Sequence, residues 1–168
     1  MINNHIFIYV NICGNISHTK KYVATAERFD TVENKWEEIA DMHKGRNDAF
    51  GVATENKIFV AGGLRNGTKL KTCEMYNTST NEWQLVANLN VPRCYGSMVC
   101  LNGKLYVLGG ENDRNQKELS VECFDPLYDQ WIHETTIPNI FPGNSISFTG
   151  SVLKFFKELL DTFKTVRQ

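Results

Sequence analysis

Three tryptophans, Trp36, Trp83 and Trp131, recur along the chain at gaps of 47 and 48 residues. Other features keep the same period. A glycine pair occurs at Gly62–Gly63 and Gly109–Gly110, and an arginine occurs at Arg46 and Arg93. A Glu-x-aromatic segment occurs at 27–30, 74–77 and 122–125. A fixed period of this length indicates stacked copies of one small unit, each unable to bury its apolar face alone. The chain is therefore predicted to be a repeat array, which favours binding over catalysis.

Each copy has the pattern of four short strands. In the central copy these are expected at 49–54, 57–61, 71–76 and 82–86, separated by segments rich in turn formers. In the next copy, Asn102-Gly103 joins apolar runs at 97–101 and 104–108, and Asn-Gly is a strong signal for a tight hairpin turn. Four antiparallel strands per period are typical of a propeller blade.

The order of these motifs resembles the kelch repeat. The segments that carry the resemblance are Lys-Leu-Tyr-Val-Leu-Gly-Gly at 104–110, Val-Glu-Cys-Phe-Asp-Pro at 121–126, Asp-Gln-Trp at 129–131 and Val-Pro-Arg at 91–93. The resemblance covers about residues 9 to 138. This part of the chain is similar to the propeller of kelch-like adaptors, in which BTB and BACK domains precede the kelch repeats. It implies an all-β fold, a partial kelch β-propeller.

The pattern predicts about two complete four-stranded blades plus flanking strands, over residues 1–149. The first copy begins within its second strand near 9–12 and has Cys13-Gly14 in place of the double glycine. Beyond Pro138 the repeat breaks, because Phe141 stands at the arginine position and no further Gly-Gly follows. A propeller closes into a ring to avoid bare sheet edges, so a fragment, a ring completed by a partner or a truncated product is expected.

The last part of the chain, 150–168, does not follow the repeat. Its apolar residues have helical spacing, and Ser151 suits the N-cap of an amphipathic helix. Such a helix could cover a sheet edge, bind a partner or represent an altered terminus. Its charges of mixed sign disfavour a membrane-surface anchor.

The repeated residues also have structural roles that need no family. The tryptophans and the preceding Phe or Tyr are expected to pack between blades. An acid that recurs within a strand is costly to bury alone, so Glu27, Glu74 and Glu122 are predicted to accept hydrogen bonds from backbone groups or arginines inside the blade.

The composition offers little support for catalysis. The net charge of −1 gives no electrostatic case for nucleic acid, and the five cysteines include no C-x-x-C pair. The four histidines show no ligand spacing, and no phosphate-binding loop is present. Copper oxidases with kelch folds need Tyr and His ligands that match no residue here. We therefore expect no catalytic residue, no metal, no cofactor and no enzyme activity, in a cytoplasmic protein.

The loops between second and third strands and between fourth and first strands should meet at one face of the propeller. In kelch-like adaptors the corresponding positions often contact a substrate peptide. The resemblance therefore implies partner-binding roles for Arg46 and Arg93, and by position alone for Arg65, Asn66, Asn112 and Arg114. Arginine suits the recognition of carboxylates, as in an acidic peptide degron. For Arg46 and Arg93 a purely architectural role is an equal alternative.

The resemblance implies substrate recognition for a cullin-based ubiquitin ligase. The BTB domain, which binds the cullin, and the BACK domain are absent from these 168 residues, so this chain would supply the recognition part. One alternative is an actin-binding or cytoskeletal scaffold, and another is a truncated product without independent activity.

Overall fold

The computed structural model describes residues 24–30, 32–54 and 56–137, and every regular element in these ranges is a β-strand. The strands form two four-stranded sheets and three two-stranded pairs. Within the same ranges, no helix has the length and apolar character needed to cross a membrane.

Each four-stranded sheet is an antiparallel meander, in which strands adjacent in sequence are adjacent in the sheet. Blade A contains β3 (Phe50–Ala53), β4 (Lys57–Ala61), β7 (Cys73–Asn77) and β8 (Glu82–Val86). Blade B contains β10 (Ser97–Leu101), β11 (Lys104–Leu108), β13 (Ser120–Asp125) and β14 (Gln130–Thr136). The predicted two blades and their four strands are confirmed, with strand ends that differ by a few residues.

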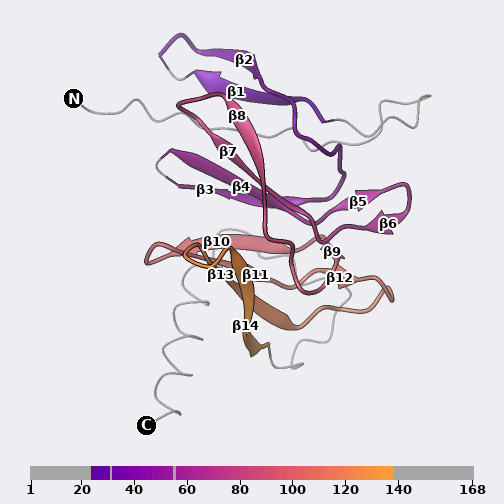
Figure 1. The fold of residues 1–168 in the computed structure, drawn as a ribbon. Helices are drawn as coiled ribbons and strands as arrows, with labels where there is room; N and C mark the ends of the chain where they lie inside the picture. The colour runs from indigo at the N-terminus through magenta and orange to yellow at the C-terminus, as the bar shows by residue number, and fades with distance from the viewer. Residues whose placement is uncertain (1–23, 31, 55, 138–168) are drawn as a thin grey trace.

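A half-blade precedes blade A. It consists of β1 (Ala26–Asp30) and β2 (Lys35–Ile39), paired antiparallel. In Figure 1 this pair, blade A and blade B lie one after another in chain order, like consecutive blades around part of a ring. The architecture is thus a partial propeller.

The other short strands occur in the loops. β5 (Leu64–Arg65) and β6 (Thr68–Lys69) form a small hairpin after the first glycine pair. β9 (Arg93–Cys94) pairs with β12 (Glu111–Asn112), which follows the second glycine pair. All four strands lie at the same end of the blades (Figure 1). The sequence pattern predicted turns here but not this additional pairing.

The tight turns have the expected chemistry. Asn102 and Gly103 have φ angles of 51° and 75°, and Asn66 and Gly67 have φ angles of 52° and 75°. Two successive residues with positive φ define the primed turn that matches the twist of a hairpin. The Asn-Gly prediction at 102–103 is therefore confirmed.

The core lies between the sheets. Trp131 of blade B packs in one cluster with Phe50 and Phe59 of blade A, whereas Trp83 of blade A packs with Ala26 and Ile39 of the half-blade. The prediction of tryptophans between blades is confirmed for these two. Trp36 is 50% exposed, although it still contacts Phe29 with ring centroids 5.3 Å apart, because it lies on the side of the half-blade that faces away from blade A.

Some predictions concern residues outside the described ranges. These are the second strand of the first copy near 9–12, the helix within 150–168 and the domain boundary at 149/150.

Candidate functional site: the loop face

The loops that join second to third strands and fourth to first strands meet at one end of the blades. We call this surface the loop face and define it as residues 43–49, 64–70, 91–96 and 111–118. Backbone bonds hold it together: Asn47 and Leu64 exchange N–H···O bonds of 2.9 and 2.7 Å, and β9 pairs with β12 in the same way in the next copy. The predicted gathering of these loops is confirmed.

The glycine pairs allow the loops to approach closely. Gly62 and Gly63 have φ angles of 64° and 96°, in the region that side chains disfavour. A Cβ on Gly62 would lie 2.3 Å from the carbonyl oxygen of Arg93, and a Cβ on Gly63 would lie 2.5 Å from that of Asn47. Glycine is thus required both for the backbone conformation and for the space.

Arg46 belongs to a loop-face segment, but its side chain has no exposed surface. Its Nη1 donates to the carbonyl oxygens of Gly62 and Thr72 at 2.9 and 2.8 Å, and its Nη2 donates to Glu74 Oε1 at 2.6 Å. Glu74 is also fully buried and accepts further bonds from the backbone N–H groups of His43 and Lys44. The Arg46–Glu74 pair therefore links the segment that precedes β3 to β7, the third strand of blade A.

Arg93 repeats this arrangement in blade B. Its Nη1 donates to the carbonyl oxygens of Gly109 and Ser120 at 3.3 and 2.9 Å, and its Nη2 donates to Ser120 Oγ and Glu122 Oε1 at 2.8 and 2.6 Å. Both members of the Arg93–Glu122 pair are at most 1% exposed. Burial lowers the pKa of the Arg93 guanidinium, and the Glu122 carboxylate opposes this shift.

This geometry corresponds to the architectural alternative for the two arginines, since neither guanidinium is accessible to a partner in this structure. The prediction that the recurring acids accept backbone and arginine hydrogen bonds is confirmed for Glu74 and Glu122. Glu27 is partly buried, and none of the described arginines forms an ion pair with it.

A lysine joins the loops of the two blades. Lys69 Nζ donates to Glu111 Oε1, to the carbonyl oxygen of Asn112 and to Asn115 Oδ1, and its side chain is only 6% exposed. Because Lys69 belongs to blade A's hairpin and its three acceptors belong to blade B's loop, the loop face is held as one surface.

Asn112 is occupied within its own loop. Its Oδ1 accepts from the backbone N–H groups of Arg114 and Gln116 at 3.0 and 3.1 Å, and its Nδ2 donates to Glu118 at 3.3 Å. An Asn that caps its own loop in this way stabilises a turn. The side chain has little hydrogen-bonding capacity left for a partner.

The other three predicted residues lie at the surface. Arg65, Asn66 and Arg114 are exposed, and no described carboxylate forms an ion pair with either guanidinium. Asn66 has the positive φ of the hairpin turn. The structure therefore separates the six candidates into two buried arginines, one loop-stabilising asparagine and three exposed side chains.

Tyr95 is a further candidate that the sequence interpretation did not select. It is 54% exposed and has a φ of 57°, a conformation that is rare for a bulky residue. The Asp48 carboxylate raises the pKa of its phenol, and the Tyr95 N–H donates to the Asp48 carbonyl oxygen at 3.0 Å. In the sequence, its position two residues after Arg93 could have indicated that Tyr95 lies in a loop of this face.

Two observations bear on metal and thiol chemistry at this surface. In the described part of the chain, no three His, Cys, Asp or Glu side chains are grouped so that they could hold a metal ion. Cys94, the loop-face cysteine, is buried, and burial raises the pKa of its thiol to about 11. Thiolate reactivity requires the opposite shift.

Comparison with known proteins agrees with the architecture. The Kelch motif matches residues 45–90 and 92–136, whereas no curated protein matches the chain. A solved structure described as "Structure of YjhT" is similar with a TM-score of 0.64 and 19% identity, over 69% of this chain and 45% of that one. This likeness shows the fold, and the chain spans less than half of that protein's length. Kelch motifs over more than half of its residues show that the chain belongs to the kelch-repeat family, whose repeats generally form propeller modules for protein binding.

Proposed function

We propose that the loop face recognises an acidic segment of a partner protein. The observation that carries the proposal is a pair of exposed arginines, Arg65 and Arg114, for which the described residues supply no ion-pair partner. A guanidinium presents donors in a planar fork that matches a carboxylate. The exposed ring of Tyr95 lies on the same face, and Tyr is a common anchor in interfaces.

The loop face is suited to recognition because it is held in place. The β9–β12 pairing and the contacts of Lys69 fix the loops that carry these side chains. Asp48 and Asp113 are also exposed on this face, so its charge is mixed. A partner's acids would therefore be read by individual arginines and not by a broad positive field.

In a cell, we infer that this binding selects substrates for a cullin-based ubiquitin ligase. The kelch repeats support this assignment through the resemblance to kelch-like adaptors. In such a complex, a BTB-containing polypeptide would bind the cullin while this chain binds the substrate.

The test is affinity purification of the tagged 168-residue chain from cells, followed by mass spectrometry. Arg65→Gln and Arg114→Gln should each lose the same captured proteins. Lys104→Gln is the matched control, because Lys104 is the exposed first residue of β11, at the opposite end of blade B. Thermal melting of each variant should be unchanged, since all three side chains are exposed.

The ligase role is tested separately. A captured protein should accumulate when cullin activation is inhibited, and its turnover should depend on Arg65 and Arg114. Retention of all captured proteins by both arginine variants would contradict recognition by the loop face. Captured proteins whose turnover is independent of cullins would contradict only the ligase role, and co-sedimentation of the chain with actin filaments would then favour the scaffold alternative.

A further inference from the structure

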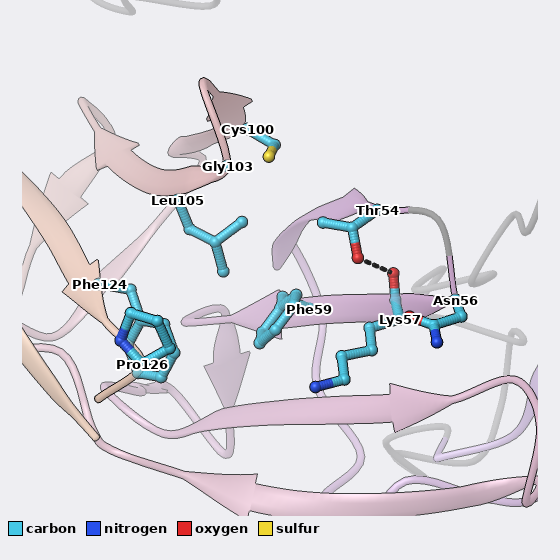
Figure 2. A pocket seen from close by; sticks show the side chains of 9 residues that line it. All are labelled: Thr54, Asn56, Lys57, Phe59, Cys100, Gly103, Leu105, Phe124 and Pro126. Carbon is cyan, nitrogen blue, oxygen red and sulfur yellow. Dashed lines mark hydrogen bonds between the residues drawn. The ribbon is translucent and has the colours of Figure 1, made fainter. Parts of the chain in front are cut away.

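A cleft of about 510 Å³ lies between blades A and B, at the end opposite the loop face. Its walls come from the turn between β3 and β4, from the turn between β10 and β11, and from the end of β13. Figure 2 shows Phe59 between polar residues of the first turn and the apolar residues of blade B. The volume is within the range of clefts that bind small molecules.

The inner walls of the cleft are apolar. Phe59 and Phe124 lie with ring centroids 6.0 Å apart and planes tilted by 54°, and Leu105 lies beside them. Cys100 adds a partly buried thiol from blade B. This combination offers two aromatic rings and aliphatic groups to an apolar ligand.

The rim carries one cation. Among the described residues that line the cleft, Lys57 alone has a charged side chain, and none of the described carboxylates forms an ion pair with it. Thr54 in the same turn is already engaged, because its Oγ1 donates to the Lys57 carbonyl oxygen at 3.1 Å. Lys57 therefore supplies the cationic donor of the described rim, where the side-chain amide of Asn56 also lies.

The repeat provides an internal comparison. Lys104 occupies in β11 the position that Lys57 occupies in β4, at the first residue of the second strand. Lys104 is exposed and does not line the cleft, whereas Lys57 is partly buried and does. The repeat alone accounts for a lysine at both positions, but only Lys57 is placed beside an apolar cleft.

We propose that this cleft binds a small apolar carboxylic acid, with its hydrocarbon part between Phe59 and Leu105 and its carboxylate at Lys57. An ammonium beside a partly desolvated apolar wall favours an anion over a neutral group of the same shape. This site lies apart from the loop face and does not depend on the function proposed for it.

The probe is 4-biphenylacetate, and the readout is alkylation of Cys100 by iodoacetamide in the full chain, resolved by peptide mass spectrometry. The efficiency typical of small ligands predicts a Kd of a few tenths of a millimolar, so about 1 mM probe should slow alkylation of Cys100 about fourfold. Cys73, Cys94 and Cys123 are buried and serve as internal controls for folding.

Lys57→Gln should raise the Kd of the probe about two- to fivefold, as expected for a partly exposed ion pair, so that about 1 mM probe slows alkylation of Cys100 only about 1.7- to 2.7-fold. Lys104→Gln should leave the fourfold slowing unchanged. The neutral analogue 4-biphenylmethanol should protect less than the acid. Absence of protection in the unsubstituted chain would overturn the proposal. Equal protection of Lys57→Gln and the unsubstituted chain would also overturn it, and unchanged alkylation of the three buried cysteines would confirm that both proteins were folded.

Discussion

Substitution of Arg93 by Ala gives the sharpest test of the buried arginines. The change removes a guanidinium with no exposed surface that donates to three carbonyl oxygens, a hydroxyl and a carboxylate. Glu122, 1% exposed, would keep its bonds from Asn90 and Val91 but lose the one cation that pairs with it among the described residues. Breaking a buried ion pair from one side typically costs about 3–5 kcal/mol.

That cost is large compared with the total stability of a small domain, which is about 5–15 kcal/mol. We therefore expect Arg93→Ala to unfold at much lower urea concentration than the unsubstituted chain, as followed by tryptophan fluorescence. Arg114→Ala is the matched control: it removes an exposed arginine of the loop face and should change the free energy of unfolding by less than about 0.5 kcal/mol.

A double variant separates the ion pair from simple loss of packing. If an unpaired buried Glu122 causes the destabilisation, adding Glu122→Gln to Arg93→Ala should restore part of the lost stability, because the amide carries no charge. An unchanged urea midpoint for Arg93→Ala would refute the architectural interpretation. If partner binding were lost at the same time, Arg93 would return to the list of recognition residues.

Three other predictions use the same unfolding assay. Trp131→Ala should lower the free energy of unfolding by about 3–5 kcal/mol, because the ring is buried between blades. Trp36→Ala should lower it by less than half as much, because Trp36 is 50% exposed. Equal losses of stability would contradict the assigned interface. Tyr95→Gly should leave the free energy of unfolding unchanged or raise it by up to about 1 kcal/mol, since Tyr95 has a φ of 57°. The same substitution should reduce partner capture. A clear loss of stability would argue against strain at this position. Burial raises the pKa of the Cys73 thiol to about 12 from an ordinary value of 9.0. The unfolded chain therefore loses this proton at a lower pH than the folded chain, and the free energy of unfolding should fall as the pH rises above about 9. Cys73→Ala should show a smaller fall in the free energy of unfolding between pH 8 and pH 10.

The fold could be predicted in detail because its signals are local and repeated. The predicted strands at 57–61, 82–86, 97–101 and 104–108 coincide with β4, β8, β10 and β11. Period-two apolar patterns and an Asn-Gly turn depend only on neighbouring residues. The loop pairings of β5–β6 and β9–β12 were missed because two-residue strands carry no such periodicity.

The candidate site was harder to predict, because exposure depends on contacts between residues distant in sequence. Arg93 and Arg114 are the same residue type in neighbouring loops, yet one is fully buried and the other is exposed. The difference arises from Glu122, 29 positions away from Arg93. No local pattern around either arginine indicates whether it pairs with a buried carboxylate. The recurrence of both the acid and the arginine was a partial signal of such a pair.

Recurrence itself offers a physical rule for dividing the two kinds of residue. Every blade must bury the same ion pair and present the same glycines to the same neighbouring backbone, so Arg46 and Glu74 recur as Arg93 and Glu122. A partner protein has no reason to follow the period of the propeller, and the side chains that bind it need not recur. Arg65 corresponds to Asn112, and Arg114 corresponds to Gly67. Arginines that are exposed and absent from the corresponding position of the other copy are therefore the ones that we expect to determine which partner is bound.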